Sequence, residues 1–286
     1  MMSLEIRPMT PDDVPAAAAV MESGGWRGRG PFIEWCLANP TIDPLVGLLD
    51  GRLVATGQGA RNGPVGWVGS IFVDPTLRRR GYGQAITDEV CRRLEAAGCT
   101  TLALIASDLG RPIYAAMGFR IDAWYQIWEA APQETGPRPR AGTRLRAMTG
   151  ADADRVGALD RRATGEDRRG LLRELTDSTW LLETDDGEEP LGFLAQAHPE
   201  SGTIVAPDPD DAAILLDLLR KRVHGIGEVA RAALVRPNDG EVSPTARALL
   251  AGRGWQPRFE TPRMLRGPSI EWDPSLIWGV LGFAFG

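Results

Sequence analysis

Two segments about 140 residues apart begin in the same way, and this repeat limits what the chain can fold into. Residues 6–10 read IRPMT and residues 145–149 read LRAMT, and two acids follow within five positions in each case. In both, a short strand leads to a threonine suited to capping a helix whose first turn is acidic. A second pair, residues 115–119 (AAMGF) and 250–255 (LAGRGW), keeps a similar offset: 145 − 6 = 139 at the start and 254 − 118 = 136 at the glycine before the aromatic residue. The repeat predicts two copies of one fold, and a chance match of short segments is the alternative.

A stretch rich in proline, glycine and charge separates the two copies. Residues 130–142 read AAPQETGPRPRAG and have no apolar periodicity, which is typical of a linker. We therefore predict a first domain at residues 1–130, a linker at residues 131–142 and a second domain at residues 143–286. A chain of 286 residues is long enough for two domains of ordinary size.

Strands and helices alternate in the first copy. The predicted strands lie at residues 4–9, 67–73, 101–106 and 119–128, with a hairpin at residues 45–59 around Asp50 and Gly51, and the predicted helices lie at residues 10–22, 32–38, 82–97 and 112–117. This order predicts an α/β fold around a mixed, largely antiparallel sheet.

Residues 71–85, IFVDPTLRRRGYGQA, carry the most distinctive chemistry. A strand ends at Pro75, which cannot donate to a ladder, and a helix begins near Gly81. Gly81 and Gly83 let the main chain bend or approach a ligand closely, and the N–H groups at the helix start then suit a pyrophosphate. Three consecutive arginines add guanidinium groups that match the geometry of a nucleotide 3′-phosphate.

This segment resembles the signature of the GCN5-related N-acetyltransferase (GNAT) superfamily, which is Arg/Gln-x-x-Gly-x-Gly/Ala after a strand ending in Val-x-Pro. Residues 73–75 and 78–83 match that signature, and residues 113–119 (IYAAMGF) are similar to the family's second landmark. An exposed arginine-rich turn would not explain that spacing. The resemblance implies that the first copy binds acetyl-CoA. The residues that it implies for this cofactor are Ile71, Phe72, Val73, Arg78, Arg79, Arg80, Gly81, Tyr82, Gly83, Gln84 and Asp108.

The resemblance also implies direct attack of an amine on the thioester. The main chain of residues 71–73 would pair with the pantetheine arm, and one N–H group there would stabilise the oxyanion. Tyr114 matches the family tyrosine that protonates the departing thiolate, because a phenol with a pKa of about 10 suits a thiol with a pKa of about 8.5. A core aromatic is the alternative role for Tyr114. Asp108 stands where many relatives carry asparagine, which puts its side-chain contact to pantetheine in doubt.

The sequence leaves the general base open. The strand before the loop carries no acid, so a water held by Ser70 and the C-terminal carboxylate of Gly286, behind the apolar residues 278–285, are hypotheses. The loop predicted to face the acceptor, residues 24–30 (GGWRGRG), contains Trp26. This tryptophan is either a core anchor or a wall on which the acceptor stacks.

The second copy lacks the loop chemistry. Residues 205–211 read VAPDPDD, where acids replace the glycines and arginines and would repel a pyrophosphate. This half resembles the cofactor-free second domain of two-domain bacterial family members. The charged run at residues 160–169 (DRRATGEDRR) is typical of a solvated helix end, and a surface facing the active cleft is the alternative.

Composition excludes several classes of function. A net charge of −6 and a pI near 5.2 argue against nucleic-acid binding. Three scattered cysteines and two histidines argue against disulfides and a metal site, and no apolar run has the length of a membrane span or signal peptide. We predict a cytoplasmic N-acetyltransferase of bacterial type, monomeric or homodimeric, that moves acetyl from acetyl-CoA to a primary amine of a small molecule. A non-catalytic acetyl-CoA sensor and a protein N-acetyltransferase are the alternatives.

Overall fold

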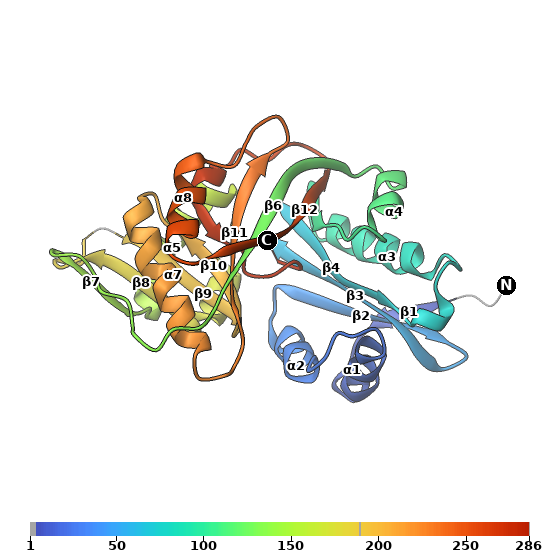
Figure 1. The fold of residues 1–286 in the computed structure, drawn as a ribbon. Helices are drawn as coiled ribbons and strands as arrows, with labels where there is room; N and C mark the ends of the chain where they lie inside the picture. Colours follow the sequence, from blue (N-terminus) through green and yellow to red (C-terminus); the bar gives the residue numbers. More distant parts are fainter. Residues whose placement is uncertain (1–3, 189, 286) are drawn as a thin grey trace. The chain divides into compact units, whose positions relative to one another are not determined.

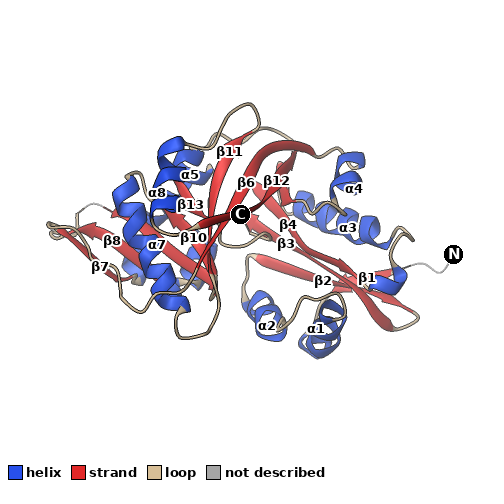
Figure 2. Ribbon diagram, viewed as in Figure 1, coloured by secondary structure: helices blue, strands red, loops and turns tan. Residues whose placement is uncertain are grey.

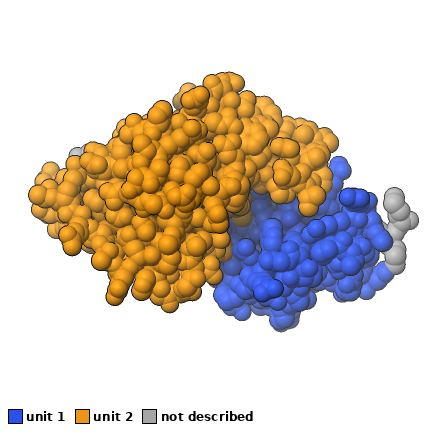
Figure 3. Space-filling model, viewed as in Figure 1, with its two compact units in different colours: residues 1–104, 266–268, 285 blue, residues 105–265, 269–284, 286 orange. Residues whose placement is uncertain are grey.

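The computed structural model describes residues 4–188 and 190–285, and these residues form two compact units. The first unit contains residues 4–104, 266–268 and 285, and the second contains residues 105–188, 190–265 and 269–284 (Figure 3). The helices are α1 (Val14–Glu22), α2 (Gly30–Ala38), α3 (Tyr82–Ala96), α4 (Arg111–Ala116), α5 (Ala153–Thr164), α6 (Arg169–Glu174), α7 (Pro209–Val223) and α8 (Pro244–Gly252). The strands are β1 (Glu5–Pro8), β2 (Ile42–Leu49), β3 (Arg52–Asn62), β4 (Val65–Val73), β5 (Thr101–Ile105), β6 (Arg120–Ala130), β7 (Thr143–Ala147), β8 (Thr179–Thr184), β9 (Pro190–His198), β10 (Ser201–Val205), β11 (Ala230–Pro237), β12 (Gln256–Arg266) and β13 (Ile277–Gly279) (Figure 2).

The first unit is built on a mixed sheet in the order β1-β2-β3-β4-β5. Neighbouring strands are antiparallel except β4 and β5, which are parallel and pair at residues 65–67 and 101–103. Helices α1 and α2 cover one face of this sheet and α3 covers the other (Figure 1). Helix α3 packs closely on β3 because that strand carries Gly57 and Gly59, and a Cβ atom at Gly59 would lie 2.9 Å from the side chain of Leu94. This packing fixes the place where α3 begins, after β4.

The second unit has a sheet in the order β12-β6-β11-β10-β9-β8-β7, with β13 paired to β10. Strand β6 is antiparallel to both of its neighbours, and its residues 123–130 pair with β11 in continuous register. Strands β10 and β11 are parallel and pair at Ser201 and Arg231. The helices α5 and α7 pack on this sheet, and most of their buried apolar residues belong to two clusters in the core.

The predicted repeat is present in the structure. Arg7 binds Asp13 through two hydrogen bonds of 2.7 and 2.8 Å, and Arg146 binds Asp152 with the same two distances. Both carboxylates also close a capping box at the first helical turn of their half. The expected hairpin is present too, since Asp50 and Gly51 have positive φ angles of 50° and 79°. The chain therefore has the predicted α/β fold in tandem.

Strand β6 complicates the predicted domain boundary. The prediction assigns residues 1–130 to the first domain, but β6 takes both of its neighbours from the second half of the chain. Residues 131–142 contain no helix or strand, and an ion pair of 2.7 Å between Arg140 and Asp211 attaches them to α7. The limits 1–130, 131–142 and 143–286 thus describe the repeats, and their folding as separate domains stays a prediction.

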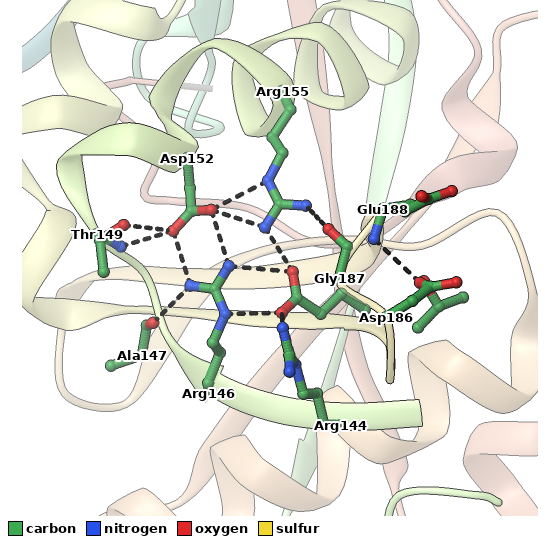
Figure 4. A network of polar contacts seen from close by, with 11 residues as sticks. Arg144, Arg146, Ala147, Thr149, Asp152, Arg155, Asp186, Gly187 and Glu188 are labelled. Carbon is green, nitrogen blue, oxygen red and sulfur yellow. Dashed lines mark hydrogen bonds and ion pairs between the residues drawn. The ribbon is translucent and has the colours of Figure 1, made fainter. Parts of the chain in front are cut away.

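An ion-pair network joins β7 and β8 to α5 in the second unit (Figure 4). Arg144, Arg146 and Arg155 surround the carboxylate of Glu183, which is fully buried, and the last two also bind Asp152. Burial alone raises the pKa of Glu183, but hydrogen bonds from the three guanidinium groups outweigh it and lower the pKa to about 2. The hydrogen bond from Arg146 is the largest of the effects that lower the pKa of Asp152. This network therefore ties α5 to β7 and β8 around one buried carboxylate.

The three cysteines are buried and unpaired with each other. Burial raises the pKa of Cys91 to about 12, so its thiol stays protonated and unreactive at neutral pH. Among residues 4–188 and 190–285 there is no group of three potential metal ligands, and no helix combines the length and apolarity needed to cross a bilayer.

Candidate active site

Strand β4, which leads into the predicted cofactor loop, contains a β-bulge. Its pairing with β3 shifts register between Thr56 and Gln58, so Ser70 and Ile71 together oppose one residue. Ser70 has a φ of +50°, and Thr56 Oγ1 donates a 3.0 Å hydrogen bond to its carbonyl oxygen. A non-glycine residue in this backbone region costs about 1–3 kcal/mol, and bulges re-aim main-chain groups out of the ladder. The bulge lies at the start of residues 71–73, where the predicted mechanism needs an N–H donor.

The three consecutive arginines after β4 have different surroundings. Arg78 folds back, donates from Nε to the carbonyl of Val73 at 3.2 Å, and lies 5.5 Å above the ring of Phe72. All three arginines are exposed, and Arg79 has a φ of +61°. Arg78 therefore stabilises the loop through its two contacts while its charge, like those of Arg79 and Arg80, stays accessible to solvent.

The turn itself is fixed by an aspartate and a glycine. Asp74 accepts hydrogen bonds from Thr76 Oγ1 and Thr76 N at 2.7 and 2.9 Å, which lower the pKa of Asp74. Gly81 caps α3 with a φ of +84°, a conformation that favours glycine. A Cβ atom at Gly81 would meet no atom within 4 Å, and one at Gly83 would meet Val73 at 3.7 Å. The space above Gly81 is therefore open, and Gly83 is bordered by Val73 alone.

The start of α3 is suited to a diphosphate. The first helical hydrogen bond runs from Ala85 N to Gly81 O at 3.0 Å, so the N–H groups of residues 82–84 have no acceptor within the helix. The first turn carries no acidic side chain. Open N–H groups and the positive end of the helix dipole attract anions. The geometry thus fits the pyrophosphate site predicted from Gly81 and Gly83.

The loop between α1 and α2 packs against the end of β4. The ring of Trp26 lies 5.5 Å from that of Phe72, and a Cβ atom at Gly24 would lie 2.3 Å from the Phe72 ring. The guanidinium of Arg29 lies over Trp26 at 5.4 Å and over Phe32 at 5.6 Å. Trp26 keeps 37% of its surface exposed. It is both an anchor and an accessible ring, so each of the two roles weighed for it retains support.

Tyr114 and Asp108 lie in the second unit. The half-buried Tyr114 ring packs against the Phe119 ring, with 6.1 Å between the ring centroids. A Cβ atom at Gly110 would lie 2.6 Å from the Tyr114 ring. Ser107, rather than Asp108, caps the turn, since its Oγ accepts from Gly110 N at 3.2 Å. The side chain of Asp108 is 96% exposed. The proton-donor role of Tyr114 and the cofactor contact of Asp108 stay predictions.

The equivalent helix start in the second half is closed to anions. Asp208 caps α7 by accepting a 2.8 Å hydrogen bond from Asp210 N, and Asp210 and Asp211 stand in the first turn. The position of Tyr114 is taken by Leu250, which is fully buried and accepts the same main-chain bond from the aromatic residue five positions later. The second half therefore supplies its own negative charge where the first half is open.

Strand β13 occupies the opening between β10 and β11 in the second half. It pairs with β10 and contacts β11. Trp278 Nε1 donates to the carbonyl of Ala206 at 3.0 Å, and a Cβ atom at Gly279 would lie 2.4 Å from the carbonyl of Gly202. The corresponding opening in the first half, between β4 and β5, is where the family resemblance implies the pantetheine arm. Acidic capping and β13 are thus two separate obstacles to a cofactor in the second half.

The charged run at residues 160–169 is partly core. Asp160 and Arg168 are fully buried and paired at 2.5 Å, and Arg168 donates to Thr203 at 3.0 Å. With the buried Glu166, Arg168 borders a cavity of about 10 Å³, which has room for one water. The expected solvated helix end was wrong for these residues, because opposite charges eight positions apart pair and can be buried together. Arg161 and Arg169 form surface ion pairs with Asp167 at 2.6 and 2.7 Å.

The structure places the predicted cofactor residues from Ile71 to Gln84 at the β4–α3 junction of the first unit. Sequence reasoning missed the bulge at Ser70 and the strand β13. The bulge could not be predicted because a serine within a strand pattern does not indicate a positive φ. Strand β13 could not be predicted because its three residues are too few to show a periodic pattern. Of the apolar residues near the C-terminus, Trp278 and Phe285 are buried, whereas Phe283 is 45% exposed. Gly286, one hypothesis for the general base, lies outside the described residues.

A strand with a bulge, an arginine-rich turn and an open helix start follow one another at the β4–α3 junction, and this junction lies within the part of the chain that matches a known family. Residues 11–119 match the model of the acetyltransferase (GNAT) family. A curated relative, the mycothiol acetyltransferase of Clavibacter michiganensis subsp. michiganensis, is 32% identical over 186 residues, which is 57% of this chain and 60% of the relative. The chain thus matches less than two thirds of that relative's length.

Solved structures show the same fold. A proposed acetyltransferase from Pyrococcus horikoshii superposes with a TM-score of 0.77 at 24% identity, covering 100% of this chain and 97% of the other. A tandem GNAT protein from the clavulanic acid biosynthesis pathway gives 0.61 at 20% identity, covering 93% and 100%. These structures show that the chain has a tandem GNAT fold, and residues 11–119 are the part that matches the GNAT acetyltransferase family model.

Proposed function

We propose that this chain is an acetyl-CoA-dependent N-acetyltransferase that acts on a primary amine of a small molecule and binds its cofactor in the first half. The observation that carries the proposal is the contrast between the two helix starts. Helix α3 begins with open N–H groups beneath Gly81 and Gly83, and α7 begins with Asp208 in their place. Because the two halves share a fold, this difference points to an anionic ligand in the first half.

The chain's own residues fit the parts of such a reaction. The N–H groups of residues 82–84 and the exposed Arg79 and Arg80 would hold the phosphates. A main-chain N–H near the bulge at Ser70 would stabilise the oxyanion, and acetyl-CoA would supply the activated thioester. Tyr114 would give a proton to the departing thiolate. The amine would attack directly, so the protein's main contribution is to orient the two reactants.

An amine panel followed by thiol release tests this proposal. The acceptor of the mycothiol acetyltransferase is the first compound to try, followed by aminoglycosides, polyamines and amino-acid derivatives. We expect turnover with at least one amine, and a loss of about a hundredfold in kcat for Tyr114→Phe, since general acids contribute about that factor or more. Equal rates for the two proteins would remove Tyr114 from its role.

The same panel separates the alternatives. Tight acetyl-CoA binding without transfer to any amine would favour a sensor. Transfer to peptide N-termini in preference to small amines would favour a protein N-acetyltransferase. The exposed, ring-bearing loop at Trp26 supports a small acceptor, because one accessible aromatic face suits a single ring or chain better than an extended peptide.

A further inference from the structure

A row of rings and guanidinium groups in contact runs through the first unit from the loop after β4 to α2. Arg78 lies over Phe72 at 5.5 Å, and Trp26 lies 5.5 Å from the same ring. Arg29 then lies over Trp26 at 5.4 Å and over Phe32 at 5.6 Å. We call these five residues the aromatic row. It connects the acceptor loop, residues 24–30, with β4 on one side and α2 on the other.

Phe285 covers the α2 end of the aromatic row. Its ring lies 5.8 Å from Phe32 and 5.6 Å from Trp35, and the residue is fully buried. Its carbonyl accepts a 3.3 Å hydrogen bond from Nδ2 of Asn62, which is itself buried. By its contacts Phe285 belongs to the first unit, although residues 269–284 belong to the second. Both the ring and the main chain of this residue are therefore fixed.

Helix α2 needs such a cover because it has two apolar faces. Ile33 and Cys36 are buried, and Ile33 belongs to the core cluster under α1. Phe32 and Trp35, also three positions apart, share a different face and are half-buried. Without Phe285 that second face would lose two ring contacts, while α1 and β2 would still contact α2.

We infer that Phe285 is a positioning residue for the acceptor loop. The loop has little stiffness of its own, since Gly25 and Gly28 adopt φ angles of +92° and +66° with no neighbouring atom within 4 Å of a Cβ position. Main-chain hydrogen bonds tie its first residues to the end of α1, among them Trp26 N to Met21 O at 3.1 Å, and its far end continues into α2. Because Phe285 packs on α2, it supports the α2 end of the loop, where Arg29 lies over the Trp26 ring. The inference rests on the proposed function where it concerns acceptor binding, and on contacts alone where it concerns the loop.

The test compares Phe285→Ala with Phe283→Ala and Phe285→Leu in the full chain. Phe283 is 45% exposed and two positions away, so it is a matched control, and leucine refills most of the buried volume. Hydrogen exchange of residues 24–38 and 82–96 reports loop order without any need for turnover. Isothermal titration gives the acetyl-CoA Kd, and initial rates give the acceptor KM and kcat for the best amine of the panel.

We expect Phe285→Ala to speed exchange in residues 24–38 by about tenfold and to leave residues 82–96 unchanged. The acceptor KM should rise by about tenfold while the acetyl-CoA Kd stays the same, because orientation of the acceptor alone is lost. Phe285→Leu should restore both values, and Phe283→Ala should match the wild type. Unchanged exchange in residues 24–38, or equal acceleration in both segments, would overturn the inference. Local acceleration in a protein that acetylates no amine would sustain loop positioning and remove the proposed function instead.

Discussion

Gly83→Asp is expected to weaken acetyl-CoA binding by about a hundredfold and leave the fold intact. Gly83 is the second residue of α3, and the second residue of α7 is Asp210, so the substitution copies an arrangement that the same fold already contains. The new Cβ atom would meet Val73 at 3.7 Å, an ordinary contact. A carboxylate in the first turn stabilises a helix by about 0.3–1 kcal/mol, and replacing a helical glycine stabilises it by a similar amount. The melting temperature should therefore stay the same or rise slightly.

The loss of binding follows from charge. A carboxylate about 5 Å from a phosphate charge, at an effective dielectric constant of about 20, costs about 3 kcal/mol. That energy corresponds to a Kd weaker by about a hundredfold. Gly83→Ala is the control, because it adds the Cβ atom without the charge. Isothermal titration with acetyl-CoA at low and high salt measures the effect, which should shrink as salt screens the charges. If Gly83→Asp binds within about threefold of Gly83→Ala, the diphosphate does not lie at this helix start.

Two further predictions concern the second unit. The three guanidinium groups lower the pKa of Glu183 from its usual 4.5 to about 2, so Glu183→Gln should cost about 3 kcal/mol at pH 7. Since the folded-state pKa is the lower one, this stabilisation is present above about pH 4.5 and is lost as pH falls toward 2. Urea unfolding should therefore show a smaller difference in unfolding free energy between wild type and Glu183→Gln at pH 3 than at pH 7. An equal difference at both pH values would contradict the prediction. Gly279→Val places a side chain against the Gly202 carbonyl, 2.4 Å from the Cβ position, and should lower stability by about 1–3 kcal/mol while the acetyl-CoA Kd of the folded protein is unchanged. An unchanged melting temperature would show that β13 does not fill the opening.

Local features of the fold follow from the sequence because their causes lie within a few residues. Ile86, Val90 and Leu94 recur at helical spacing, and all three are buried on one face of α3. Asp50 and Gly51 predict a tight hairpin, and both adopt the positive φ angles that such a turn requires. The β4–α3 junction belongs to the same class, since the proline, the arginines and the glycines that form it are consecutive.

Features that depend on distant partners do not follow from the sequence. The alternation of β6 predicts a strand, but nothing in it indicates that β11 and β12, over a hundred positions later, pair on either side. Asp160 and Arg168 read as solvated charges because each is costly to bury alone, and only their pairing makes burial possible. Phe285 reads as one of several apolar tail residues until its contact with Phe32 is known.

The two halves together show how little separates a cofactor-binding fold from a structural one. Helices α3 and α7 have 15 residues each and follow equivalent strands. In the second half, the Asp208 side chain accepts a hydrogen bond at the start of α7, and a cap of this kind contributes about 1 kcal/mol. Strand β13 pairs with β10 in the opening and contributes the buried Trp278. In the first half, no side chain caps the start of α3, and among the described residues no strand like β13 pairs beside β4. Ser70, with its strained φ of +50°, precedes this helix in β4. Strain and unsatisfied N–H groups persist where a ligand compensates for them, so the less self-sufficient half is the one in which acetyl-CoA binding is expected.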